Sequence, residues 1–169
     1  MELLIPGLIL VALMVWASTK IKKRAADAFE AEFVETETFS LQKPEGFLHV
    51  IGDPEHEFYA YSKEFGENDN LGFRRATIEI DFFRDKDLAG VRDSILNSAT
   101  RSEIRTQTVN VCELETEESA NEIAIRGFYK LVAAENAVYG LRFAVLVEHS
   151  DEYLRKIDET LDSFVLKTL

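Results

Sequence analysis

The three histidines are the side chains best suited to bind a metal ion, but their spacing does not favour one. His49, His56 and His149 form neither H-x-x-x-H nor H-E-x-x-H, the spacings that bring two imidazole rings to one face of a helix. Asp53 with His56, or His149 with Asp151, could share a metal, but acidic residues are frequent throughout the chain. We therefore expect no metal site and place the histidines at the surface or at strand ends.

Nucleophilic and acid–base chemistry are supported no better. Cys112 is the only cysteine and lies in TVNVCEL without a motif around it, which favours a buried, unreactive thiol. Glu79 and Asp81 would share one face of a strand and could act as acid and base, but in so acidic a chain we interpret them as a solvated face. The glycines form no phosphate-binding loop. The chain is therefore predicted not to be an enzyme, with no catalytic residue and no cofactor.

An apolar run at the N-terminus is the strongest signal in the sequence. Residues 3–17 read LLIPGLILVALMVWA, and Lys20 is the first charged residue after them. At about 1.5 Å per residue, the uncharged stretch covers roughly 25 Å of a hydrocarbon core that is ~30 Å thick. Residues 1–19 are therefore predicted to form a transmembrane helix. A signal peptide and a buried core helix are the alternatives, but the run has no basic residue before it and is apolar on every face.

The residues that follow this run predict the membrane interface and the orientation. Trp16 lies near the end of the run, where aromatic side chains gather at a membrane surface. A basic cluster comes next: Lys20, Lys22, Lys23 and Arg24. Because basic flanks stay in the cytoplasm, we expect a single-pass protein of the cell inner (plasma) membrane, with its N-terminus outside and its C-terminal domain cytoplasmic. The lone cysteine and the lack of an N-x-Ser/Thr sequon fit this placement.

Residues 20–33 are predicted to continue the helix as a basic juxtamembrane segment and stalk. Ile21, Ala25, Phe29 and Phe33 recur at i, i+4 spacing, which puts them on one apolar face. Phe29 and Phe33 are therefore candidate contacts with the protein's own domain or with a neighbouring membrane subunit. Three residues of the apolar run are expected to pack against partner helices in the same way: Leu8, Val11 and Val15.

The charge is distributed very unevenly. Glu2 is the only acid before residue 25, and four bases lie at 20–24, which leaves 30 acids and 15 bases in the rest of the chain. An anionic membrane surface would attract the basic cluster and repel the domain, so the domain is expected to hang clear of the bilayer. The same charge disfavours nucleic acid as a partner and favours a membrane subunit with a basic cytosolic face.

Residues 34–169 are predicted to form one acidic α+β domain. Alternation predicts strands over 34–41, 57–65, 76–83, 104–114, 121–133 and 138–148, with an acidic turn at 115–118. Asp85 or Asp87 is expected to cap one helix, and Ser150 a last helix with Leu154, Ile157 and Leu161 on its apolar face. Strands in hairpin order with only two helices imply an antiparallel sheet of about six strands flanked by helices.

Aromatic residues exceed what a one-sided core requires. They occur at neighbouring positions of the predicted strands and therefore on both faces of the sheet: Phe58, Tyr59, Tyr61, Phe82, Phe83, Phe128 and Tyr129. The surplus is expected to line a groove or a protein interface.

Several segments of the domain carry a resemblance to a known fold. They are Phe39-Ser-Leu-Gln-Lys-Pro44-Glu-Gly46-Phe47, the run ATIEIDFF ahead of a helix, the strands around Gly127-Phe128-Tyr129 and Tyr139-Gly140-Leu141, and the closing Leu161-Asp162-Ser163-Phe164. Over about residues 39–166 the chain resembles the PsbP-like fold of extrinsic photosystem II proteins and their bacterial relatives, an α/β/α sandwich that a Ran-binding nuclear transport protein shares. The resemblance implies a non-catalytic accessory or assembly domain docked on a larger membrane complex, and carries over no ligand residue.

These observations lead to one functional hypothesis and one alternative. The chain is expected to be a non-catalytic, membrane-anchored accessory, structural or assembly subunit of a larger membrane complex, which by family analogy alone is a photosynthetic one. The alternative is a membrane-tethered domain that binds a small apolar ligand or lipid between sheet and helix.

Overall fold

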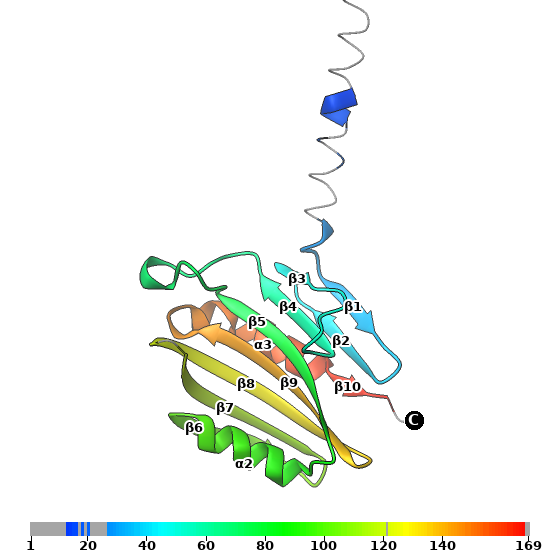
Figure 1. Cartoon of the computed structure of the whole chain (residues 1–169), viewed down its shortest axis with the longest axis vertical. Coiled ribbons are helices and arrows are strands. Elements are labelled where there is room, and N and C mark those ends of the chain that lie inside the picture. The colour runs from blue at the N-terminus through cyan, green and yellow to red at the C-terminus, as the bar shows by residue number, and fades with distance from the viewer. Residues whose placement is uncertain (1–12, 17, 19, 21–26, 121, 168–169) are drawn as a thin grey trace, which may run out of the picture.

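The computed structural model describes residues 13–16, 18, 20, 27–120 and 122–167, which form two antiparallel sheets and two main helices (Figure 1). The strands are β1 (Glu32–Glu35), β2 (Phe39–Lys43), β3 (Phe47–His49), β4 (Phe58–Ser62), β5 (Ala76–Arg84), β6 (Arg101–Gln107), β7 (Val111–Ala120), β8 (Ile123–Ala134), β9 (Ala137–Leu146) and β10 (Val165–Leu166). The helices are α2 (Leu88–Ser98) and α3 (Ser150–Ser163), with 3₁₀ turns η1 (Asn68–Asn70) and η2 (Val147–His149).

The larger sheet is the framework of the domain. Its strands lie in the order β3-β4-β5-β9-β8-β7-β6, and every pair is antiparallel. Figure 1 shows α2 in front of this sheet and α3 behind it. The expected α+β architecture of an antiparallel sheet flanked by helices is therefore confirmed.

Each face of the larger sheet carries its own core. Phe143 and Leu141 of β9 are fully buried on the α3 side, against Ile157 of α3. The opposite positions of the same strands face α2, where Val91 packs against Leu131. Since successive residues of a strand point to opposite faces, β9 is buried at most positions because both of its faces are covered. β5 and β7 alternate in burial because only one face of each is covered, the α3 side of β5 and the α2 side of β7.

The smaller sheet has the order β1-β2-β10 and packs beside α3. It corrects the predicted strand over 34–41, because residues 36–38 turn the chain and divide this stretch between β1 and β2. The Thr36 hydroxyl closes the turn by accepting a hydrogen bond from the Phe39 amide at 3.0 Å. The larger sheet has seven strands where about six were predicted, and the smaller sheet adds three, so the described residues contain ten. The additional strands include β3 and β10, which are too short to show a period of two.

The acidic stretch 115–118 is the clearest error of the sequence prediction. It was expected to be a turn, but it lies inside β7, and the chain instead turns at 108–110 and at Glu122. Thr116 and Glu118 point toward the α2 side of the sheet, and Glu115 and Glu117 point toward the opposite side. The stretch therefore alternates in direction as a strand does. The acidic stretch is compatible with a strand because Glu118 pairs with the half-buried Arg142, a contact that the local sequence does not reveal.

Both predicted helices are present, with different starts and faces. Asp87 caps α2 as expected, accepting a hydrogen bond from the Gly90 amide at 2.8 Å. Ser150 was expected to cap α3 but is the first residue of the helix, with η2 directly before it. Leu154 is exposed, whereas Tyr153 is buried, because the helix turns this side toward β2 and β9.

The described part of the N-terminal run is helical and lies away from the sheets (Figure 1). Among the residues that the structure describes, no helix has both the length and the apolar character needed to cross a membrane. The expected helical stalk does not extend to residue 33: residues 28–29 form a turn, and Phe33 belongs to β1. Backbone pairing of β1 with β2 competes with the helix here and ends it.

Lys43 joins the start of the domain to the larger sheet. Its side chain is fully buried and donates hydrogen bonds to the carbonyls of Glu30 and Phe47, the second at 2.7 Å. Burial lowers the pKa of the ammonium group, while the charge of Glu32 opposes this shift. The chain is thus held to the domain from Phe29 and Glu30 onward, since the Gly46 amide also donates to the Phe29 carbonyl at 2.7 Å.

Candidate functional site

The face of the larger sheet that carries α2 is only partly covered. Figure 1 shows α2 over one end of this face, which leaves β4, β5 and part of β9 and β8 open. We call the uncovered part the open face, and it is made by these side chains: Tyr59, Tyr61, Thr77, Glu79, Asp81, Thr116, Glu118, Tyr129 and Arg142, with Arg74 and His56 beside them. Polar and aromatic groups on a sheet face are candidates for binding.

Arg142 lies at the centre of the open face. Its register partners are Glu79 on the adjacent strand β5 and Tyr129 on the adjacent strand β8. The Arg142 guanidinium lies 3.0 Å from a carboxylate oxygen of Glu79 and 2.8 Å from one of Glu118. The side chain of Arg142 is 22% exposed, and those of Glu79 and Glu118 are 16% and 21% exposed. Ion pairs this far removed from water hold a fixed geometry better than pairs at the surface.

Further hydrogen bonds hold the two carboxylates in place. The hydroxyls of Tyr129 and Thr116 each donate to Glu118 at 2.6 Å. Gly127 provides the room for this arrangement, because a Cβ there would lie 2.7 Å from both the Thr116 hydroxyl and the Glu118 carboxylate. Any larger residue at 127 would push these groups apart.

The protonation states of this cluster are strongly fixed. Burial alone would raise the pKa of Glu118, but hydrogen bonds from Thr116 and Tyr129 and the charge of Arg142 outweigh it and lower the pKa. Burial raises the pKa of Tyr129 far above its usual value. Burial opposes the charge of Arg142, yet Tyr129 and the carboxylates of Glu79 and Glu118 raise its pKa further. Glu118 and Arg142 keep their charges at neutral pH, which suits binding and positioning better than proton transfer.

A row of rings along β4 forms the second part of the open face. The His56 ring stacks on Tyr59 with centroids 5.5 Å apart, and Tyr59 lies 6.2 Å from Tyr61. The Arg74 guanidinium lies 4.3 Å from the Tyr61 centroid and 3.8 Å from that of Phe65. Partly exposed tyrosines and arginines are enriched at protein interfaces, so this row favours a protein partner.

His56 is the titratable member of the row. Its Nδ1 lies 2.6 Å from a carboxylate oxygen of Asp81. Burial alone would lower the pKa of His56, but this hydrogen bond and the charges of Asp81, Glu79 and Asp53 raise it above 6.5. Asp53 accepts hydrogen bonds from the Glu55 and His56 amides, which positions the histidine.

The other candidates for chemistry occupy ordinary positions. Cys112 is fully buried in β7, as expected, and burial raises the pKa of its thiol. His149 is buried, not at the surface, within 3.3 Å of Glu152. Within the described parts of the chain, no group of three or more possible ligands is arranged to hold a metal ion. Glu79 and Asp81 do share a face, but they pair with Arg142 and His56 and are not freely solvated.

The predicted membrane residues are only partly within the described chain. Leu8, Val11, Lys22, Lys23 and Arg24 lie outside the described residues. Trp16 and Lys20 lie together, with the ammonium group 4.8 Å from the ring centroid.

The remaining predicted contacts lie on different elements. Val15 is 60% exposed on the N-terminal helical stretch, and Phe33 is 61% exposed on β1. Phe29 is half-buried, and its ring lies 5.9 Å from the Lys63 ammonium. Phe29 and Phe33 therefore do not form one helical face.

The central residue of the site was missed from the sequence. Arg142 is the one charged residue in the apolar strand AVYGLRFAVL, and a lone charge in such a strand requires a buried partner. That signal could have identified Arg142. Glu118 could not have been assigned as its partner, because pairing across β7, β8 and β9 depends on strand register.

No family model and no curated protein matches the chain. Several solved structures share its fold. The Ran-binding protein Mog1p of Saccharomyces cerevisiae is 14% identical, with a TM-score of 0.52 over 82% of this chain and 96% of that one. LpqN, involved in cell envelope biogenesis of Mycobacterium tuberculosis, is 11% identical, with a TM-score of 0.54 over 82% of this chain and 91% of that one.

The cyanobacterial PsbP protein (CyanoP) of Synechocystis is 11% identical to this chain. Its TM-score is 0.52 over 82% of this chain and 94% of that one. At these identities the likeness concerns the fold. The expected PsbP-like fold is thus confirmed and is shared with Mog1p and LpqN.

Replacing Arg142 with methionine tests the central cluster. The change leaves Glu79 and Glu118 facing each other without a cation, and we expect a loss of about 3 kcal/mol in the free energy of unfolding. Arg155 is the matched control, because it pairs with Glu159 but is 86% exposed, so its replacement by methionine should cost less than about 0.5 kcal/mol. Urea unfolding measures both, and equal losses would contradict a central role for Arg142.

The pH dependence of stability tests the contact between His56 and Asp81. Folding raises the pKa of His56 above 6.5, so its stabilising contribution is complete below 6.5 and is lost as the pH rises through the folded value. Between about pH 5 and about pH 8, the unfolding free energy of the wild type should therefore fall relative to that of His56→Asn. Parallel pH profiles for the two proteins would show that the contact does not form.

Proposed function

We propose that the chain is a single-pass protein of the cell inner membrane whose C-terminal domain is a non-catalytic accessory or assembly subunit of a membrane complex. One observation carries the anchoring part: four consecutive apolar side chains of the N-terminal helical stretch, Leu13, Met14, Val15 and Trp16, are 57%, 67%, 60% and 62% exposed. A contiguous exposed apolar patch indicates a membrane or protein contact. Lys20 over the Trp16 ring matches the arrangement expected at a membrane surface.

The open face supports a role in binding a protein partner. Arg142, Glu79 and Glu118 are held in ion pairs. Tyr59 and Tyr61 are half-buried, with Tyr59 stacked on His56 and the Arg74 guanidinium over the Tyr61 ring. The domain as a whole is acidic, so electrostatic complementarity favours a partner with a basic cytosolic face. Among the solved structures with this fold, CyanoP is a cyanobacterial PsbP and LpqN is involved in cell envelope biogenesis. These relatives support an accessory role, and we infer the cytoplasmic placement from the basic flank.

The ligand-binding alternative has less support. An apolar groove does lie between α2 and the sheet, lined by Phe83, Val91 and Ile95 among others, but its volume is only about 170 Å³. Ligand pockets for drug-sized molecules usually exceed about 300 Å³. This groove is too small for a lipid chain with its headgroup. A larger hollow of about 680 Å³ lies at the start of α2, but charged side chains line part of it, Asp85, Lys86 and Asp87, and these do not suit an apolar ligand.

Alkaline carbonate extraction tests the anchor. The full chain should stay in the membrane pellet, and a chain starting at Asp27 should be released, because it keeps the Phe29 and Glu30 carbonyls that the domain requires but lacks the apolar run. Val11→Lys should weaken retention, since a lysine at the helix centre costs about 3 kcal/mol, whereas Val11→Leu should not. Release of the full chain by carbonate would contradict anchoring.

Affinity purification in mild detergent tests membership of a complex. Full-length protein from its native membrane should retain a reproducible set of membrane proteins, and Tyr59→Ala should lose most of that set while remaining in the membrane. Leu154→Ala is the control, because Leu154 is an exposed apolar residue on α3, away from the open face. If the wild type retains no partner, or if both variants lose the same proteins, the open face is not the docking surface.

A further inference from the structure

The loop 63–75 lies at the end of the domain from which the chain leads back to the N-terminal run. The Lys63 amide donates to the Gly46 carbonyl at 2.8 Å, and the Gly46 amide donates to the Phe29 carbonyl at 2.7 Å. The Lys63 ammonium also lies 5.9 Å from the centroid of the Phe29 ring. The loop and the start of the domain are therefore joined directly, and Figure 1 shows η1 at the same end of the molecule as the N-terminal segment.

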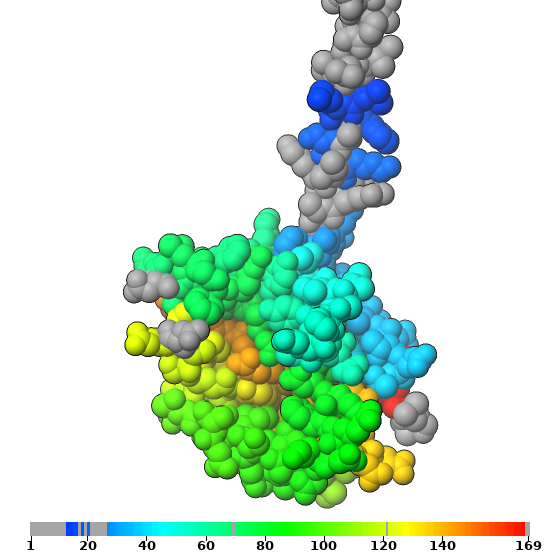
Figure 2. Space-filling view, in the orientation of Figure 1, coloured from blue at the N-terminus to red at the C-terminus, as the bar shows by residue number. Residues whose placement is uncertain are grey.

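This loop exposes apolar side chains. Phe65 is 48% exposed, Leu71 68% and Phe73 38%, and Val147 in the adjacent η2 is 42% exposed. Figure 2 shows the loop as a green lobe at the upper edge of the domain, beside the departing N-terminal segment. Several exposed apolar side chains on neighbouring segments at one end of an acidic domain make this end a candidate for contact with an apolar surface.

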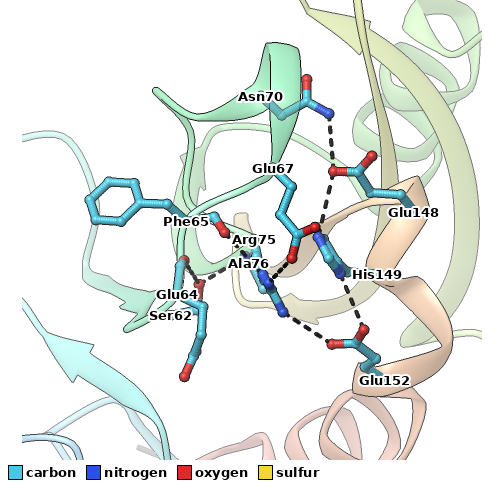
Figure 3. A network of polar contacts seen from close by, with 10 residues as sticks. All are labelled: Ser62, Glu64, Phe65, Glu67, Asn70, Arg75, Ala76, Glu148, His149 and Glu152. Carbon is cyan, nitrogen blue, oxygen red and sulfur yellow. Dashed lines mark hydrogen bonds and ion pairs between the residues drawn. The ribbon is translucent and has the colours of Figure 1, made fainter.

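The loop is held in this position by a polar network (Figure 3). Arg75 contacts Glu67 at 2.7 Å and Glu152 at 3.4 Å, and its Nε donates to the Phe65 carbonyl at 2.9 Å. The Asn70 amide donates to Glu148 at 3.2 Å. These contacts join the loop to the start of α3, so its apolar side chains are presented from a fixed base.

The charge of the loop differs from that of the domain. Residues 63–75, KEFGENDNLGFRR, contain three bases and three acids, whereas residues 25–169 contain twice as many acids as bases. A lipid surface that repels the acidic domain as a whole therefore exerts no net repulsion on this loop. The loop itself is therefore better suited to approach a bilayer than the more acidic remainder of the domain.

The length of the connecting chain keeps this end near the membrane. Lys20, at the expected interface, is nine residues from Phe29, where the domain begins. At no more than about 3.5 Å per residue, nine residues span at most about 30 Å in any conformation. The loop beside Phe29 is therefore within reach of the bilayer that holds the N-terminal run.

We propose that the loop 63–75 is a second membrane contact, in which Leu71 and Phe73 enter the interfacial region of the bilayer that anchors the chain. This inference rests on the proposed anchoring and replaces the expectation that the domain hangs clear of the membrane. Aromatic and leucine side chains on a short surface segment are suited to this depth. The contact holds the domain in one orientation, with the strands of the open face running away from the membrane.

Site-directed spin labelling of the full chain tests this contact. Leu71→Cys is labelled with a nitroxide and reconstituted into phosphatidylcholine vesicles, and Val109→Cys is the matched control because Val109 is 90% exposed in the β6–β7 turn at the other end of the sheet. The native Cys112 is fully buried and its thiol pKa is raised, so it should remain unlabelled. Flotation of the vesicles reports anchoring, and collision with oxygen or with a water-soluble nickel chelate reports depth.

We expect the protein to float with the vesicles and the label at 71 to show a severalfold higher ratio of oxygen to nickel accessibility than the label at 109. Flotation with equal ratios at the two sites would overturn the loop contact and leave the anchor intact. Absence of flotation would overturn the anchor, and the loop contact with it. Membrane-like ratios at both sites would show a domain lying flat on the bilayer, which also overturns the proposal.

Discussion

The ion pairs of Arg142 with Glu79 and Glu118 are the constraint on which the larger sheet depends. The arginine lies on the central strand β9, and its partners come from β5 and β7, so the cluster forms only when four adjacent strands are in register. A slip of one residue would reverse the face of every side chain on a strand and leave the guanidinium against α3 in the apolar core. Gly127 is part of the same constraint, because the Glu118 carboxylate occupies the space of a side chain there.

The open face follows from this cluster. A helix packs on a sheet through an apolar stripe, and only the end of the face with Leu114, Leu131 and Val138 offers one, so α2 lies there. Around Arg142 the face is polar and is satisfied by its own hydrogen bonds, which leaves no apolar surface for a second helix. The Arg142 cluster therefore has two effects: it fixes the strand register, and it prevents a second helix from packing on the sheet. The row of rings on β4 is left as a half-exposed surface of tyrosines and arginines.

Much of the fold could be predicted from the sequence, whereas the site could not. Periodicity located β5, β8, β9 and both helices, and Asp87 was one of two candidates for the cap of α2, because these signals are local. The prediction of a turn at 115–118 was wrong because glutamate and threonine occur in solvated turns and also in strands. In this strand the inward carboxylate of Glu118 pairs with Arg142. The identity of that partner depends on pairing across β8, which joins residues far apart in the chain. The stalk was extended to Phe33 for a related reason: helical spacing was visible locally, but the competing strand β2 was not.

The two ends of the sheet are chemically different, and this asymmetry links the fold to the proposed placement. At one end, Lys43 fixes the Glu30 carbonyl, and the loop beside it is electrically balanced and apolar at its surface. At the other end, the β8–β9 turn and the start of α2 carry Asp85, Asp87 and Glu135. A chain tethered through the first end presents the second to the solvent, and the open face, whose strands run between the two ends, then looks along the membrane. If the proposed anchoring holds, a partner subunit in the same bilayer would approach from that direction and could reach the tyrosines of β4 while the N-terminal run stays in the membrane.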